Sequence, residues 1–269
     1  MKKGFIHLMC IVLIFAVLTP LSATAQQPEV SFKMEGEEIT FIKDTDEESI
    51  YRIKENGKTI EYHEKVKENK NKTTIHVKVY EVQDGKKNLI DNFKNELITV
   101  SDTVFIFTDD TGNAHSLNLN NDKKFEKIDA DVILREPGFS TLGVRYVTKS
   151  GGSLVADTRY RIFSDGSSEA IMAGENPYYK NTRKKNSNFI DFTHYADGLK
   201  SDELDLITFG IAGFADDLIK ALRGGKLLSW SLIKKIVGTA VKVGPFGAAL
   251  TLFSYGKNYT KAQKAYRAI

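Results

Sequence analysis

The last 47 residues of the chain, 223–269, contain nine lysine or arginine residues and no aspartate or glutamate. Within them, residues 226–243 (KLLSWSLIKKIVGTAVKV) separate when they are wound as a helix: the apolar side chains gather on one half and the lysines on the other. The sequence therefore predicts an amphipathic, cationic helix near its C-terminal end.

Gly244-Pro245 predicts the end of this helix, because glycine tolerates a left-handed terminus and proline fits only the first turn of a helix that follows. A second helix is expected over 246–269, which makes the pair a cationic helical hairpin. A third, acidic helix is expected over 201–222, with Ser201 as its N-cap and a net charge of −4. We expect this acidic helix to pair with the hairpin, which carries +9.

Neither hairpin helix has the composition of a membrane span, which needs about 20 nearly uncharged apolar residues. The pattern is typical of a helix that lies in a membrane interface, with its apolar side buried and its lysines on anionic headgroups. An amphipathic helix that simply covers a protein core is the alternative. The residues expected to contact a membrane are Trp230, Ile233, Lys234, Lys235, Val237, Lys242, Phe246, Leu250, Phe253 and Lys257.

The N-terminal end has the pattern of a secretory signal peptide: two lysines, an apolar run over 5–18, and small residues at Ala23 and Ala25. Cleavage is expected after Ala25. The only cysteine, Cys10, lies inside the apolar run, so the mature chain would be free of cysteine. An exported chain without disulfides favours a secreted, extracellular protein of a Gram-positive bacterium.

From about residue 38 to 174 the sequence alternates short apolar and polar runs with turn signals, which is typical of antiparallel β-structure. Asn56-Gly57 and Asp84-Gly85 predict tight hairpins. A turn is also predicted at Ser150-Gly151-Gly152, and an occasional helix is left open near 86–96. The expected fold class is α+β, with an antiparallel sheet or small sandwich followed by about three helices.

The expected organisation is a signal peptide over 1–25, a β-rich domain over 26–180, a linker over 181–200 and a cationic helical region over 201–269. The linker is polar and basic, and Arg183-Lys184-Lys185 within it would suit either a protease-accessible site or a solvated loop.

The sequence contains no recognisable catalytic, cofactor-binding or metal-binding motif. The mature chain has four scattered histidines without metal-ligand spacing, and neither a nucleophile elbow, a phosphate loop nor a dinucleotide fingerprint. The expectation is therefore no catalytic, cofactor or metal site, and residues 109–113 (DDTGN) are expected to form a hairpin turn. A hydrolase site built on Asp191, His194 and Asp197 is the weaker alternative. The mature net charge of +1 gives no case for nucleic acid.

A cysteine-free secreted chain of this size, with a β-rich body and a cationic, apolar C-terminal end rich in small residues, resembles the geobacillin-type large, heat-labile bacteriocins. The likeness is one of layout from Ala25 onward, with 207–255 as its most suggestive part, and no functional residue is transferred from it. It implies antibacterial activity against related Gram-positive cells without enzymatic chemistry. The partners expected are an anionic target membrane or a surface receptor, with an immunity protein as a further partner. The oligomeric state is left open.

The alternative of a different class is a secreted, non-lytic binding or surface-associated protein whose helices only pack on the sheet.

Overall fold

The computed structural model describes residues 29–34, 37–55, 57–118, 145–153, 155–222, 229–240 and 244–269. Its first part is an eight-stranded antiparallel sheet in which each strand pairs with its neighbours in the sequence. Antiparallel neighbours need only short turns between them, and short turns are what the sequence provides. The strands are β1 (Val30–Met34), β2 (Glu37–Asp44), β3 (Glu48–Glu55), β4 (Lys58–Asn69), β5 (Lys72–Gln83), β6 (Lys86–Thr99), β7 (Val104–Thr108) and β8 (Ala114–Asn118).

The predicted hairpins of this sheet are confirmed. Gly57 (φ 76°) turns the chain between β3 and β4, and Gly85 (φ 75°) turns it between β5 and β6. The stretch 109–113 is the turn between β7 and β8, where the Asp109 carboxylate accepts hydrogen bonds from the backbone N–H groups of Thr111 and Asn113. Residues 86–96, for which a helix was left open, belong to strand β6.

One face of the eight-stranded sheet carries the apolar core of this part, because alternate residues of each strand point to the same side. The cross-strand register keeps these residues in rows: Ile53 lies opposite Ile39 on one side and Ile60 on the other. The buried apolar residues of this face are Ile39, Phe41, Tyr51, Ile53, Ile75, Val77, Val79, Leu97, Phe105, Phe107 and Leu117.

A second, four-stranded antiparallel sheet has the order β12-β11-β10-β9. Its strands are β9 (Val147–Ser153), β10 (Thr158–Phe163), β11 (Ser167–Met172) and β12 (Tyr179–Arg183). The antiparallel β-structure expected for residues 26–180 is confirmed, and it is divided between these two sheets.

The turn predicted at Ser150-Gly151-Gly152 is wrong: all three residues lie inside β9, paired with β10. Their glycines serve close packing instead of a turn. A Cβ at Gly151 would collide with the side chains of Asp197 and Tyr160. At Gly152, where φ is 106°, it would collide with the carbonyl oxygen of Thr158.

The helices are α3 (Ser187–Thr208), α4 (Ala212–Leu222), α5 (Trp230–Ala240) and α6 (Pro245–Ala268). The linker expected at 181–200 differs from the structure, because β12 runs to Arg183 and α3 begins at Ser187. Asn186 caps α3 by accepting a hydrogen bond from the N–H of Phe189 at 3.1 Å. Ser201 accordingly lies inside α3 and is not an N-cap.

The breaks between the helices follow glycine. Gly210 (φ 73°) separates α3 from α4, so the single acidic helix expected over 201–222 is instead the end of one helix and the whole of another. The break predicted at Gly244-Pro245 is confirmed: Gly244 is left-handed, with φ 64°, and Pro245 is the first residue of α6.

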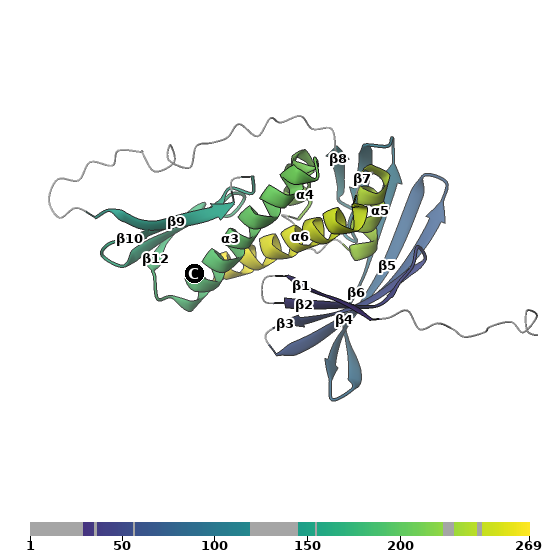
Figure 1. The fold of residues 1–269 in the computed structure, drawn as a ribbon, viewed down its shortest axis with the longest axis horizontal. Helices are drawn as coiled ribbons and strands as arrows, with labels where there is room; N and C mark the ends of the chain where they lie inside the picture. Colours follow the sequence, from purple (N-terminus) through teal and green to yellow (C-terminus); the bar gives the residue numbers. More distant parts are fainter. Residues whose placement is uncertain are drawn as a thin grey trace, which may run out of the picture.

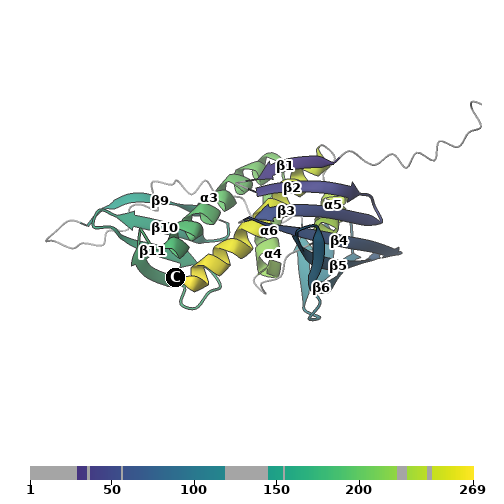
Figure 2. The same cartoon turned by 90° about the horizontal axis from the view of Figure 1, so that it is seen from below.

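Helix α6 is the element that joins the two sheets. Figures 1 and 2 show the sheets at opposite ends of the molecule, with α3 and α6 running between them. The two helices are antiparallel neighbours, since Asn188 near the start of α3 donates to the carbonyl of Ala268 at the end of α6. The fold class is α+β, as expected from the sequence: a large antiparallel sheet followed by C-terminal helices.

Candidate functional site

Helix α5 contacts the eight-stranded sheet through its N-terminus. The carboxylate of Glu64, on β4, accepts hydrogen bonds from the backbone N–H groups of Trp230 at 2.9 Å and Ser231 at 2.7 Å. The hydroxyl of Tyr51, on β3, donates to the same carboxylate at 2.8 Å. A helix N-terminus carries unpaired N–H groups and a partial positive charge, so a carboxylate there stabilises the helix in place.

Glu64 is fully buried at this contact. Burial raises the pKa of Glu64, while the hydrogen bonds from Ser231, Tyr51 and Trp230 act in the opposite direction by stabilising the ionised form. Ser229 completes the helix start by accepting a hydrogen bond from the N–H of Leu232 at 3.2 Å. The backbone N–H groups in the first turn of α5 thus find acceptors partly in the helix's own cap and partly in a strand more than 160 positions away in the sequence.

The apolar residues that the sequence analysis assigned to a membrane lie mostly in the protein core. Trp230 is fully buried, and its ring centroid lies 4.8 Å from that of Phe41 and 5.9 Å from that of Phe253. Ile233, Val237 and Phe253 are also buried, Leu250 is half-buried, and Phe246 is 39% exposed. In the folded chain the apolar side of α5 therefore covers the sheet.

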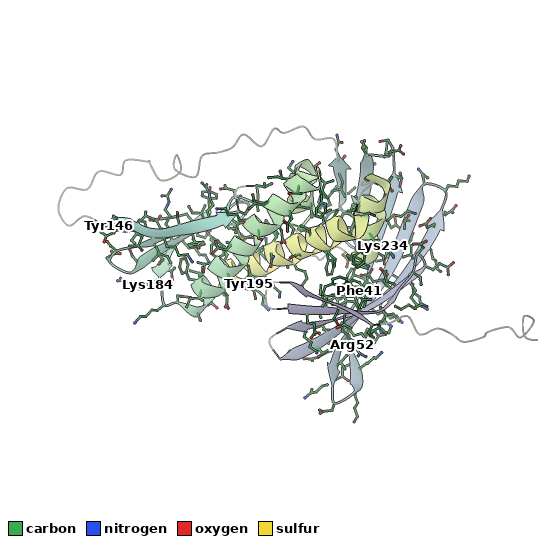
Figure 3. The ribbon with its side chains drawn as sticks, viewed as in Figure 1. Phe41, Arg52, Tyr146, Lys184, Tyr195 and Lys234 are labelled. Atoms are coloured by element: carbon green, nitrogen blue, oxygen red, sulfur yellow. The ribbon has the colours of Figure 1, made fainter. Side chains whose placement is uncertain are left out.

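The lysines of α5 pair with acids from the sheet. Lys234 lies 2.7 Å from Asp44, which also accepts from the indole N–H of Trp230, and Lys235 lies 2.6 Å from Glu68. Figure 3 shows Lys234 and Phe41 where α5 meets this sheet. Lys257, on α6, is 5% exposed, while Lys242 lies outside the described residues.

The pairing expected between the acidic segment 201–222 and the cationic hairpin does not involve Lys234 or Lys235 of α5. Asp217 instead accepts from the N–H of Asn118 at 3.1 Å and pairs with Lys220 on its own helix. The acids that pair with the lysines of α5 come from β2 and β4. The hydrophobic face of α5 packs on the interior, which places its lysines near the ends of those two strands.

The acidic segment does bind the hairpin, but through buried hydrogen bonds to α6. Asp202 accepts from Ser254 at 3.0 Å and from Asn258 at 2.9 Å. Glu203 accepts from Tyr255 at 3.0 Å and also from Ser153 of β9. Both acids are buried, so α3, α6 and the second sheet share one polar cluster in the interior.

A groove of about 1120 Å³ opens along α5, between this helix, the turn from β2 to β3 and strand β4. Its charged lining residues are Lys43, Lys65, Lys67, Lys234, Lys235, Asp46, Glu47, Glu48 and Glu68. Five positive and four negative groups leave the groove almost balanced in charge. Two of these cations, Lys43 and Lys235, pair with Glu48 and Glu68 of the same groove.

The residues considered for a hydrolase lie along the exposed side of α3. The carboxylate of Asp197 accepts a hydrogen bond from Tyr160 at 2.8 Å and lies 3.9 Å from the ammonium group of Lys149. The ring of His194 lies against its neighbour Tyr195, with 5.2 Å between centroids. Within the described part of the chain, no group of three or more histidine, cysteine, aspartate or glutamate side chains is arranged to hold a metal ion.

The comparisons add no family to this geometry: neither a family model, nor a curated protein, nor a solved structure matches the chain. Of the helices that the structure describes, none combines the length and the apolar character needed to cross a bilayer. The predicted signal peptide, with Ala23 and Ala25, lies outside the described residues.

On the other face of β4, Glu61 is the centre of an ionic cluster. Its buried carboxylate lies 2.7 Å from Arg52, 2.5 Å from Lys87 and 2.5 Å from His63. Burial by itself would raise the pKa of Glu61, but the hydrogen bonds from Lys87, His63 and Arg52 outweigh it and lower that pKa to about 2.

We expect Glu61→Gln to lower the free energy of unfolding by about 2 kcal/mol at pH 7. The ordinary pKa of this group is 4.5, so its contribution is complete above pH 4.5 and is lost as the pH falls towards 2. Urea unfolding at pH 7, 4 and 2.5 should show the gap between wild type and variant closing with acid. Glu81→Gln, which removes a carboxylate paired with exposed Lys58, is the matched control and should change stability by less than about 1 kcal/mol. A gap of constant size would contradict the assignment.

Proposed function

We propose that this chain is a secreted, bacteriocin-like antibacterial protein that acts on the target cell membrane through its cationic C-terminal helices, without enzymatic chemistry. In this proposal α5 is the element that leaves the fold. The observation that carries it is the division of α5 into two sides: Trp230, Ile233 and Val237 are buried in the interior, while Lys234 and Lys235 pair with acids at its rim. These are the two sides of a helix that binds a membrane interface.

Helix α5 suits this role better than α6. Most of α6 is buried, with interior contacts to α3 and to both sheets, so its removal would open both cores. Helix α5 has 11 residues against the 24 of α6, and it contacts β2, β3, β4 and α6. The left-handed residue Gly244, between α5 and α6, gives the chain a point about which α5 can swing while α6 stays in place.

The energetics support an exchange of one apolar environment for another. The buried side chains of α5 each gain about 1.5–3 kcal/mol from burial in the core, and insertion into lipid would return a comparable amount. An anionic surface adds about 1 kcal/mol for each lysine close to it. The membrane therefore competes with Asp44 and Glu68 for the two lysines, and the contact at Glu64 and the packing of α5 on α6 are left to break.

Dye leakage from vesicles tests the proposal. The mature chain, residues 26–269, should release dye faster from anionic than from zwitterionic vesicles. Lys234→Gln with Lys235→Gln should reduce the rate on anionic vesicles at least fivefold, because two charges near the lipid surface are removed. Lys184→Gln with Lys185→Gln is the matched control, since it removes an adjacent, exposed pair of lysines from the turn before α3.

If both double variants leak more slowly than wild type and at the same rate, net charge alone determines leakage. That result would remove α5 from the mechanism. Truncation before α4 would be a poor substitute for these variants. The shortened chain would lack α4, α5 and α6, and both cores would lose helices that pack against them.

The second candidate is the secreted, non-lytic binding protein. It is favoured by one specific observation: the apolar side chains of α5 are already satisfied in the core, with Trp230 and Val237 fully buried. In that case the balanced groove beside α5 is the surface to examine for a protein partner. A wild-type chain that neither binds nor permeabilises anionic vesicles would favour this candidate over the first.

A further inference from the structure

The four-stranded sheet has an outer face that the helices do not cover. Alternate residues of its strands, such as Tyr160, Ala170 and Met172, are buried towards α3 and α6. The residues between them point to the opposite side. The register places Arg161 of β10 beside Glu169 of β11, and Glu169 beside Asn181 of β12, so the outer side chains form continuous rows across the sheet.

Arginine is concentrated on this face. The whole chain has 30 lysines and only eight arginines, and six of the arginines are among the described residues. Four of those six belong to this face or its margin: Arg145, Arg159, Arg161 and Arg183. A chain that uses lysine almost everywhere else thus presents guanidinium groups here, and guanidinium differs from ammonium in offering two parallel N–H donors to one oxyanion.

The arginines are held in position by acids and an aromatic ring. Glu169 lies between two of them, 3.1 Å from Arg145 and 3.9 Å from Arg161. The guanidinium of Arg145 also lies 3.5 Å from the centroid of the Phe163 ring. Contacts of this kind limit the rotamers of long side chains, so less entropy is lost when a ligand binds them.

Arg159 is held in the same way at the other side of the face. It lies 2.5 Å from Asp157 and 3.3 Å from the hydroxyl of Tyr178, which itself donates to Asp157. Its Nε–H has no acceptor among the described residues. A third carboxylate, Asp165 in the turn between β10 and β11, interacts with Arg145 and Arg183. Four guanidinium groups against three carboxylates leave an excess of one positive charge, and Arg183 at the edge strand is exposed.

We propose that this face binds a polymer of phosphodiesters on the surface of the target cell. The bidentate donors select phosphate oxygens, and arginines placed in different rows of the sheet suit repeated phosphates along a flexible chain. Position favours a polymer over the lipid surface itself: Figure 1 places this sheet at the far end of the molecule from α5, the helix assigned to the membrane. The site would hold the protein at the cell surface while α5 remains free to act.

This inference adds a receptor to the proposed function, but its test needs no membrane, so the two can fail separately. The probe is poly(glycerol phosphate) with a fluorescent end label, and the readout is fluorescence anisotropy with the folded mature chain at several salt concentrations. Arg161→Gln with Arg183→Gln should weaken binding at least tenfold. It should also reduce the slope of log affinity against log salt by about 1 to 2, because about two phosphate contacts are lost.

Two matched variants distinguish a specific arginine site from non-specific electrostatic attraction. Lys65→Gln with Lys67→Gln removes two cations from the groove of the other sheet and should change affinity less than twofold. Arg161→Lys with Arg183→Lys keeps the charge but removes the forked donors, and it should weaken binding about threefold to tenfold. Circular dichroism establishes that each variant is folded before its affinity is compared.

Three results would overturn the proposal. If the Arg-to-Lys variant binds the polymer as tightly as wild type, the face recognises charge alone and not the geometry of the guanidinium donors. Polyglutamate of the same charge bound as tightly as poly(glycerol phosphate) would show that phosphate is not selected. Anionic vesicles that compete for the labelled polymer, and that lose this ability in the Arg-to-Gln variant, would assign the face to lipid.

Discussion

Oxidation of a Ser49→Cys, Ser231→Cys variant should abolish leakage from anionic vesicles, and reduction should restore it. The two hydroxyl oxygens lie 3.3 Å apart in the interior, which brings thiols at these positions within reach of a disulfide. Ser49 belongs to β3 and Ser231 to the first turn of α5, so the bond would hold α5 on the sheet. Because Cys10 lies in the predicted signal peptide, the mature variant would contain this pair of cysteines alone.

The same disulfide should stabilise the fold, because it closes a loop of about 180 residues in the unfolded chain. The chain-entropy relation gives about 5 kcal/mol for such a loop, and strain in the native state reduces that amount. Urea unfolding with and without reductant measures the effect. The Ser49→Cys single variant, treated with the same oxidant, should leak like wild type. Rapid leakage from the oxidised double variant would show that α5 stays docked during leakage, and it would remove α5 from the proposed mechanism.

Glu64→Ala should lower the free energy of unfolding by about 4 kcal/mol. The change leaves the hydroxyl of Tyr51 and two N–H groups of α5 buried without their acceptor, and it removes the negative charge from the helix N-terminus. Under the proposed function it should also speed leakage, because the contact that opposes the release of α5 is gone. Denaturant unfolding and vesicle leakage on the same preparation report the two effects.

Glu68→Gln is the matched control for this variant. Its carboxylate also binds α5, through Lys235, but its side chain is 48% exposed, and an ion pair of that kind contributes less than about 1 kcal/mol. A Glu64→Ala variant as stable as Glu68→Gln would show that water replaces the buried carboxylate. The contact would then not be what holds α5.

The parts of the fold that could be predicted from the sequence are those set by neighbouring residues. The hairpins at Gly57 and Gly85 and the helix start at Pro245 follow from backbone preferences that act over two to four residues. The same local reasoning failed at Gly151 and Gly152. Two adjacent glycines usually mark a turn, but here they allow α3 and β10 to approach the strand closely.

The contacts that make the candidate site depend on residues far apart in the sequence. Nothing local indicates that Asp44 and Glu68 would receive the lysines of α5, some 190 and 167 positions away. For Glu64 a signal was present. Tyr62, Glu64 and Val66 alternate along β4 on its inward side, so an acid stood where the strand pattern calls for an apolar residue. Such an acid is stable there only when donors meet it, and the start of α5 supplies them.

The position of α6 between the two sheets has a consequence for the order in which the chain matures. A polypeptide that emerges from a membrane channel N-terminus first releases all twelve described strands before α6 appears. Until then the buried acids of α3, Asp202 and Glu203, lack their hydrogen-bond donors from α6. The contact between Phe253 of α6 and Tyr51 of the eight-stranded sheet is also missing, so neither core is complete. Folding would then wait until translocation is nearly complete. Under the proposed function, α5 would therefore acquire its docked place only after most of the chain has crossed the membrane.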